Sequence, residues 1–260
     1  MQIDNEMYQI HGHEWWSEGA SFDVLCLRYC MNPVRYAYFR RKIEKLPLPG
    51  RTLLDVGCGG GFLAEEFARD GFAVTGIDPA TRSLEAARKH AADNNLDIDY
   101  REGKGEALPF PDASFDVVAC CDVLEHVDDL SLVIREVART LKPGGVFFYD
   151  TVNRTWFSKL AVIKLSQEWN FTRWCKPNSH VWEKFIKPAE LLAFLNRNGL
   201  TNQELRGISS RKNPLALLAS LRAVKKGKLN HRAIGPSFDL CETEDLRVSY
   251  MGYAIKSPRV

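Results

Sequence analysis

Short apolar runs alternate with amphipathic stretches through the first part of the chain. Runs rich in Leu, Val, Ile, Phe and Cys are typical of buried strands, whereas apolar residues three and four apart predict helices. The pattern predicts strands at 52–57, 73–77, 98–101, 115–120 and 146–151. It predicts helices between them at 61–70, 82–93 and 130–141, the last of which is expected to end at glycine caps in Lys142-Pro143-Gly144-Gly145.

This alternation also predicts how the chain is organised. Strands that alternate with helices pair in parallel through right-handed crossovers, as in a doubly wound α/β domain. Two later strands, 204–209 and 248–256, are predicted to complete a mostly parallel sheet of seven strands with helices on both faces. We expect a helical N-terminal extension at 1–50, a ligand-binding core at 51–153, and an acceptor or lid segment at 154–260 that includes a late insertion at 210–245.

A glycine-rich turn follows the first predicted strand. Gly57, Gly59 and their neighbours allow a tight turn and a close approach of the backbone to a ligand. A dinucleotide fold would require a glycine where Phe62 stands, and the carboxylate of Asp55 would repel a pyrophosphate. The same carboxylate can pair with an ammonium group. The turn therefore indicates a site for S-adenosylmethionine rather than for a nicotinamide cofactor; an ordinary βα turn is the structural alternative.

Other polar residues stand at the ends of the predicted strands. Asp78 ends the second strand, where a carboxylate can accept hydrogen bonds from both ribose hydroxyls of a nucleoside. Cys121 and Asp122 follow the fourth strand. Ligands of open α/β sheets bind beyond the carboxyl ends of the strands, so these residues are expected to surround one cofactor.

Composition indicates the class of protein and its cellular compartment. The chain has 260 residues, 45% of them hydrophobic, which suits one decorated α/β domain. Its 35 basic and 33 acidic residues leave a net charge of +2, which gives no indication of nucleic-acid binding. The seven cysteines have no CxxC pair and no metal spacing, so we expect reduced thiols and a cytoplasmic protein. Neither a secretory signal nor a membrane span is predicted.

Several motifs together resemble one enzyme family. They are Trp15-Trp16, Asn32-Pro33-Val34-Arg35, the glycine motif at 53–61, Val74 to Asp78, Leu124-Glu125-His126-Val127, the LKPGG motif at 141–145, Thr151 to Arg154, and His180 with the segment 184–191. The chain resembles the class I S-adenosylmethionine-dependent methyltransferases, which have a Rossmann-like fold. More narrowly, it is similar to the ubiquinone-biosynthesis O-methyltransferases.

This resemblance implies an activity and a set of contacts. The expected reaction is methylation of a ring hydroxyl on a polyprenylated catechol, a lipid-like acceptor. Arg35, Gly57, Asp78 and Cys121 fall at cofactor-contact positions of the family. The resemblance also implies contact with membrane lipid through the segment after the fifth strand, so we expect the protein to be peripheral to the inner membrane.

Methyl transfer to a phenol requires a way to remove the phenol's proton. A phenol titrates near pH ~10, so a general base or a metal ion must act at neutral pH. Asp122, Glu125 and His126 follow the fourth strand at spacings that would share one face of a helical turn. They are candidates for catalysis or for a magnesium or zinc ion. The alternative is cofactor contact for Asp122 and a structural role for His126.

Two more side chains are candidates for the site. His180 is a second possible base, with an exposed loop residue as the alternative. Arg35 is predicted to pair with the methionine carboxylate of the cofactor, which otherwise lacks a cation; a surface arginine is the alternative.

The segment 154–182 is rich in tryptophan. It contains Trp156, Trp169, Trp174 and Trp182, with the apolar run Leu160 to Ile163 between lysines. Tryptophan prefers the lipid headgroup zone, and lysine attracts anionic lipid. The segment is predicted either to rest on a membrane or to pack on itself as a substrate lid. The insertion adds a basic cluster at Arg222, Lys225, Lys226 and Lys228.

Two other functions remain open from the sequence. The chain could methylate a different small-molecule acceptor, because acceptor specificity resides in the less similar C-terminal third. It could also bind S-adenosylmethionine without catalysis. The presence of Asp122, Glu125, His126 and His180 favours an enzyme.

Overall fold

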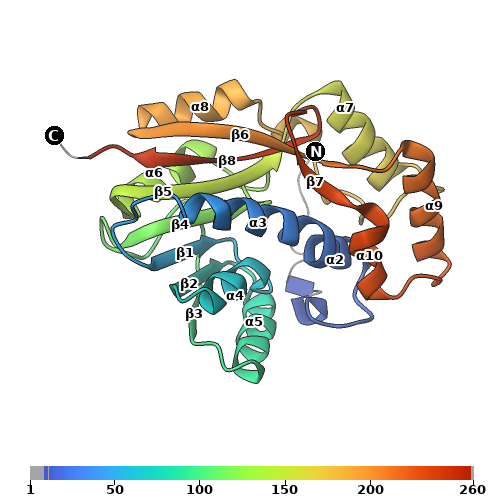
Figure 1. Cartoon of the computed structure of the whole chain (residues 1–260), viewed down its shortest axis with the longest axis horizontal. Coiled ribbons are helices and arrows are strands. Elements are labelled where there is room, and N and C mark those ends of the chain that lie inside the picture. Colours follow the sequence, from blue (N-terminus) through green and yellow to red (C-terminus); the bar gives the residue numbers. More distant parts are fainter. Residues whose placement is uncertain (1–8, 11, 259–260) are drawn as a thin grey trace.

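Five parallel strands form the first half of the sheet, in the order β3-β2-β1-β4-β5 (Figure 1). The structure is a computed structural model that describes residues 9–10 and 12–258. Residues 1–8 and 11 of the predicted N-terminal extension lie outside the described part. The five strands are β1 Thr52–Val56, β2 Ala73–Asp78, β3 Ile98–Glu102, β4 Phe115–Cys121 and β5 Leu141–Val152. All five lie where the apolar runs predict them.

The sheet is completed by three strands from the last third of the chain. These are β6 Leu200–Ser210, β7 Leu240–Thr243 and β8 Ser249–Lys256, in the order β5-β8-β6-β7 with antiparallel pairing. The sheet therefore has eight strands. The prediction of seven is wrong because the late insertion contributes β7, a four-residue strand whose half-buried side chains give no clear apolar run.

Side chains of the central strands alternate between two hydrophobic cores. Leu53 and Val117 face one core with α3 Asn32–Ile43, α4 Phe62–Arg69 and α5 Thr81–Asp93. Their neighbours Leu54 and Val118 face the other core with α6 Leu130–Thr140 and α8 Pro188–Arg197. This two-residue period explains why the central strands read as continuous apolar runs.

The LKPGG motif does not cap a helix. Helix α6 ends at Thr140 with Arg139 in its last turn, and Leu141 already has extended backbone angles. Gly144 has a φ of 77°, and it lies within the first residues of β5 rather than at a helix end. The predicted glycine caps are therefore wrong.

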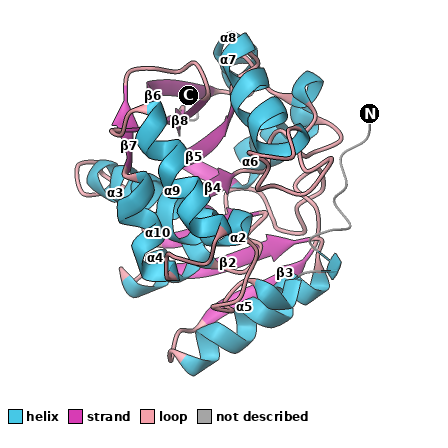
Figure 2. Cartoon of the chain, turned by 90° about the vertical axis from the view of Figure 1, so that its right-hand side faces the viewer, coloured by secondary structure: helices cyan, strands magenta, loops and turns pink. Residues whose placement is uncertain are grey.

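The N-terminal extension packs against the late insertion. The extension contains α2 Phe22–Cys26 and a π-helical turn Leu27–Met31, and the insertion contains α9 Pro214–Lys225 and α10 His231–Phe238. Leu25 and Ile234 share a small hydrophobic core at this contact. Figure 2 shows α2, α9 and α10 side by side at one end of the sheet. Two segments that are distant in sequence thus cover the same end of the molecule.

The segment after β5 forms irregular helical structure. It comprises α7 Trp156–Ser158, a π-helical stretch Lys159–Glu168, and a loop that leads to a short 3-10 helix at Trp182–Lys184. Among the described residues, none of the helices combines the length and the apolar character required to cross a bilayer.

Candidate active site

The glycine turn after β1 forms one wall of a large cavity. Gly57, Gly59 and Gly61 all have positive φ angles, and Gly61 is the N-cap residue that precedes α4. A Cβ atom on Gly57 would lie 2.3 Å from a Val123 methyl group, so only glycine fits there. The cavity has a volume of about 410 Å³, and its lining includes Arg35, Asp55, Gly57, Gly59, Asp78, Cys121, Asp122 and His126. The structure therefore brings together every predicted cofactor residue.

Asp78 holds the glycine turn in place. Its Oδ2 accepts a hydrogen bond from the Gly59 amide at 2.9 Å, and its Oδ1 accepts one from the Ala80 amide at 2.8 Å. Burial raises the pKa of this carboxyl group, and the two amides partly oppose that rise. Each carboxylate oxygen keeps a second lone pair. Hydrogen bonds from ribose hydroxyls to Asp78 remain a prediction. The bonds to the two backbone amides show that Asp78 also has a structural role.

Asp55 is a buried carboxyl group at the same cavity. It is 3% exposed, and its Oδ2 has no hydrogen-bond partner among the described residues. Burial raises the pKa of Asp55 to about 7, with a smaller opposing effect from Arg35. A buried oxygen without a partner is destabilising unless something binds it. An ammonium group in the cavity would supply that partner.

Arg35 contacts protein carboxylates. Its guanidinium forms ion pairs with Asp122 and with Asp150, the latter with 2.6 Å between Nε and Oδ2. Asp122 has a φ of 54°, and its amide donates to Asp150 Oδ1 at 2.8 Å. These contacts fix the turn after β4. Arg35 also lines the cavity, which leaves it within reach of a bound ligand. Its contact with the methionine carboxylate of the cofactor stays a prediction.

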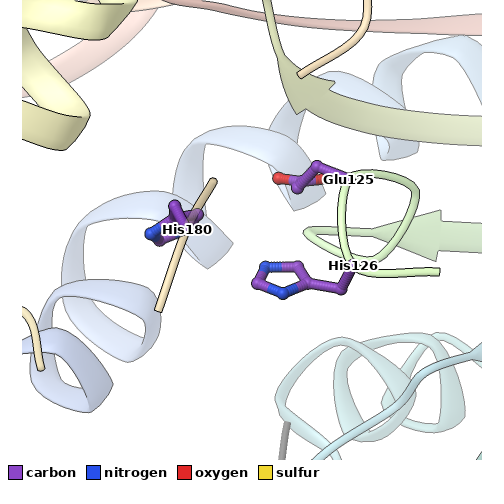
Figure 3. Close-up of side chains that lie close together, drawn as sticks. All are labelled: Glu125, His126 and His180. Carbon is purple, nitrogen blue, oxygen red and sulfur yellow. The ribbon is translucent and has the colours of Figure 1, made fainter. Parts of the chain in front are cut away.

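The residues after β4 do not form a helical turn. Asp122 has a left-handed backbone, so a continuous helical turn from Asp122 to His126 does not form and the expected shared helix face is wrong. His180 from the segment after β5 lies beside Glu125 and His126. Ligand atoms of Glu125, His126 and His180 lie within 4.8 Å of one another. Figure 3 shows the three side chains close together. This cluster contains three of the four predicted catalytic residues, and the roles of all four stay predictions.

Burial controls protonation in this cluster. It raises the pKa of Glu125 to about 8, while Thr151 Oγ1 donates to Glu125 Oε2 at 2.8 Å. It lowers the pKa of His126 to about 3, with a further contribution from His180, and it lowers the pKa of His180 as well. Both imidazoles are therefore neutral at neutral pH. Their ring centroids are 5.2 Å apart.

A second, smaller cavity adjoins the first. Its volume is about 150 Å³, and its lining includes Asp122, His126 and His180. Trp15, Leu27, Asp122 and His126 line both cavities, so the two are adjacent. A cavity of about 150 Å³ is large enough for one benzene ring. His126 of the cluster therefore lies between the larger cavity and a ring-sized space.

Trp15 and Trp16 close the glycine turn, a role that the sequence analysis did not assign. Trp15 Nε1 donates to Ser83 Oγ at 2.8 Å, and Trp16 Nε1 donates to the Gly60 carbonyl at 2.7 Å. Ring atoms of Trp15 occupy the space that a Cβ on Gly59 or Gly60 would need. The aromatic pair was recognised only as a family motif. The sequence did contain a signal for this role, namely the presence of two adjacent tryptophans in a chain that also has a run of adjacent glycines.

Comparison with known proteins agrees with this geometry. A methyltransferase-domain family matches residues 54–149. A methyltransferase structure from Methanosarcina mazei is 20% identical with a TM-score of 0.59, covering 84% of this chain and 98% of that one. One from Thermotoga maritima, described as a possible histamine N-methyltransferase, is 18% identical with a TM-score of 0.58, covering 95% and 99%. The fold and the cofactor site define an S-adenosylmethionine-dependent methyltransferase, with S-adenosylmethionine as methyl donor.

Closer relatives identify the family. The chain is 41% identical over 212 residues to the ubiquinone biosynthesis O-methyltransferase of Caulobacter vibrioides, which covers 78% of this chain and 81% of the relative. It is 36% identical over 251 residues to the enzyme of the same name from Paramagnetospirillum magneticum, covering 93% and 89%. The protein belongs to the ubiquinone biosynthesis O-methyltransferase family. The resemblance stated from the sequence motifs is confirmed.

Proposed function

We propose that this enzyme transfers a methyl group from S-adenosylmethionine to a ring hydroxyl of a polyprenylated catechol in ubiquinone biosynthesis. The observation that carries this proposal is the junction of the two cavities. A space lined by Asp55 and Asp78 meets a ring-sized space beside Glu125, His126 and His180. The names of the relatives point to the same pathway. A ring held at this junction would place one hydroxyl beside the methyl group, which is the alignment that in-line transfer requires.

We further propose that Glu125, His126 and His180 hold a divalent cation. The three donor atoms are close enough to share one ion, and burial keeps both imidazoles neutral, the form in which imidazole binds metal ions. Thr151 restrains the Glu125 carboxylate. Two imidazoles and one carboxylate suit zinc or another transition metal better than magnesium, which prefers oxygen donors. When bound, such a cation lowers the pKa of a coordinated hydroxyl.

A metal-free route would use Glu125 rather than His126 as the base. A base with a pKa of about 3, as for His126, binds a proton too weakly to remove one from a phenol. Glu125, with a pKa of about 8, is better matched to the task. This contrast favours a ligand role for His126.

An assay of methyl transfer tests the proposal. Enzyme treated with a chelator is mixed with S-adenosylmethionine and a catechol that carries a geranyl chain beside one hydroxyl, and the product is identified by mass spectrometry. We expect loss of activity after chelation and recovery with zinc, and weaker recovery with magnesium. Full activity in enzyme shown to be metal-free would refute the metal site. Failure of the untreated and metal-supplemented enzyme to methylate the catechol would refute the acceptor.

We also propose that the enzyme rests on the cytoplasmic face of the inner membrane. Large apolar side chains of the segment after β5 are exposed, among them Trp156 at 79%, Phe171 at 72% and Trp169 at 41%. Leu215 of α9 is 79% exposed, and Lys225 of the same helix donates to the Phe171 carbonyl at 3.1 Å. The basic insertion thus lies beside the aromatic loop. This exposure favours the membrane interpretation over a lid that packs on itself.

Sedimentation with vesicles tests this second proposal. We expect binding to vesicles of anionic phospholipid that weakens with added salt, and little binding to neutral vesicles. Changing Trp169 and Phe171 to serine should remove most of the binding. Trp174, in contrast, lines the smaller cavity and is not a suitable target. Ile10 is 55% exposed and its neighbour Gln9 bonds to Thr81 at the start of α5, so Ile10→Ser is the matched control. Equal sedimentation of the double variant and wild type would contradict the proposal.

A further inference from the structure

Helix α2 of the N-terminal extension forms one wall of the smaller cavity. The lining of this cavity includes Ser21, Asp23, Cys26 and Leu27 from this part of the chain. The opposite side comes from the segment after β5, through Trp174 and His180, and from the turn after β4. Three parts of the chain that are remote in sequence therefore enclose one ring-sized space. Most of its lining surface is apolar, as an aromatic ring requires.

Two polar atoms of α2 are buried at this wall without a partner. Asp23 Oδ1 and Ser21 Oγ have no hydrogen bond among the described residues. Ser21 stands at the N-cap position of α2, where a serine hydroxyl usually bonds to the helix backbone, yet it makes no such bond. His180 Nδ1 is buried at the same cavity and also lacks a partner. Native proteins rarely leave such atoms unsatisfied, so several together indicate a polar ligand.

The late insertion packs against α2 and holds it in position. Leu25 of α2 and Ile234 of α10 pack in the same small core, and Gly235 lies against the Tyr29 carbonyl, where a Cβ atom would come within 2.6 Å. A π-helical turn connects α2 to α3, and such turns often occur at functional sites. The insertion therefore serves to hold the wall that carries Asp23.

We infer that Asp23, assisted by Ser21, recognises a second hydroxyl on the acceptor ring, adjacent to the one that is methylated. His126 lines both cavities and marks the hydroxyl nearest the methyl group, whereas Asp23 lines only the smaller one. The second hydroxyl donates a charge-assisted hydrogen bond to an Asp23 carboxylate oxygen. Asp23 is thus a specificity residue that favours a diol over a ring with a single hydroxyl. The inference rests on the proposed methylation of a catechol.

The test compares two acceptors and three variants. The acceptors are the geranyl catechol and the same compound without the hydroxyl that is not methylated. The variants are Asp23→Ala, Ser21→Ala and, as a control, Glu18→Gln, whose side chain is 78% exposed on the same segment. For Asp23→Ala we expect the KM for the diol to rise roughly 10- to 100-fold, the range for a hydrogen bond to a charged group. The kinetics with the single hydroxyl should change little. Ser21→Ala should show a smaller effect of the same kind, and Glu18→Gln none.

The measurements separate this role from a structural one. A structural defect would reduce activity on both acceptors equally and would weaken S-adenosylmethionine binding, which calorimetry measures. If Asp23→Ala does not fold, Asp23→Asn keeps the side-chain volume and should lose part of the same preference for the diol. An unchanged ratio of kcat/KM for the two acceptors overturns the inference while leaving the proposed function intact. A wild-type enzyme that methylates neither compound refutes the proposed function instead.

Discussion

Asp55 leads to a specific prediction for the pH dependence of cofactor binding. Burial raises its pKa to about 7, so in the free enzyme it is mostly protonated at acidic pH. The cofactor's ammonium group would bind the ionised form. Binding must therefore release a proton at low pH, and affinity must increase as pH rises through the pKa of Asp55.

The size of the expected change in affinity follows from the pKa of Asp55. With a pKa of about 7, Asp55 is ionised in about one molecule in eleven near pH 6 and in about three quarters near pH 7.5. The dissociation constant for S-adenosylmethionine should thus fall roughly eightfold over this interval. Asp55→Asn should abolish the change, because an amide does not titrate there. At the upper pH its affinity should be lower by roughly 1.5–3 kcal/mol, the value of a hydrogen bond to a charged group.

Isothermal titration calorimetry gives the necessary quantities. Affinity is measured across the pH interval, and buffers of different ionisation enthalpy report the number of protons released. A cofactor analogue without the amino group is the control, and its affinity should not depend on pH. If wild-type affinity is flat with pH, the proposed pairing is wrong. If the pH dependence survives in Asp55→Asn, another group, such as Asp78, is responsible.

Three further predictions concern neighbouring residues. Asp78→Ala should weaken cofactor binding by roughly 1.5–3 kcal/mol and also lower the melting temperature, since it frees the glycine turn; an unchanged dissociation constant by calorimetry would contradict it. His126→Ala should lower turnover by roughly 10²-fold or more with cofactor affinity preserved, and the chelator should then have no additional effect; a normal rate in the variant would exclude any role for His126. Arg35→Ala should lower the free energy of unfolding, measured by urea denaturation, by roughly 3–5 kcal/mol, because it leaves Asp150 buried without its cation. A loss below ~1 kcal/mol would show that the ion pairs contribute little.

The sequence alone determined the parallel half of the sheet and which residues meet at the glycine turn. Strands buried on both faces have a strong local signature, and the glycine turn with Asp55 and Asp78 is contained in one βαβ unit. Interactions within such a unit depend on short spacings, which can be read directly. The same reasoning missed β7, whose four half-buried residues have no distinct pattern and form a strand only because β6 provides an edge.

Tertiary structure decided which residues meet in the cluster of Glu125, His126 and His180 and in the wall of the smaller cavity. Spacing predicted that Asp122, Glu125 and His126 share a helical face, but Asp122 has a left-handed backbone and pairs with Arg35. His180 joins Glu125 and His126 from a segment more than fifty residues later, and Asp23 approaches from about a hundred residues earlier. No local pattern encodes such contacts, because they depend on how the N-terminal extension and the segment after β5 pack over the ends of the strands. Burial, which sets the protonation of Glu125 and His126, likewise exists only in the folded chain.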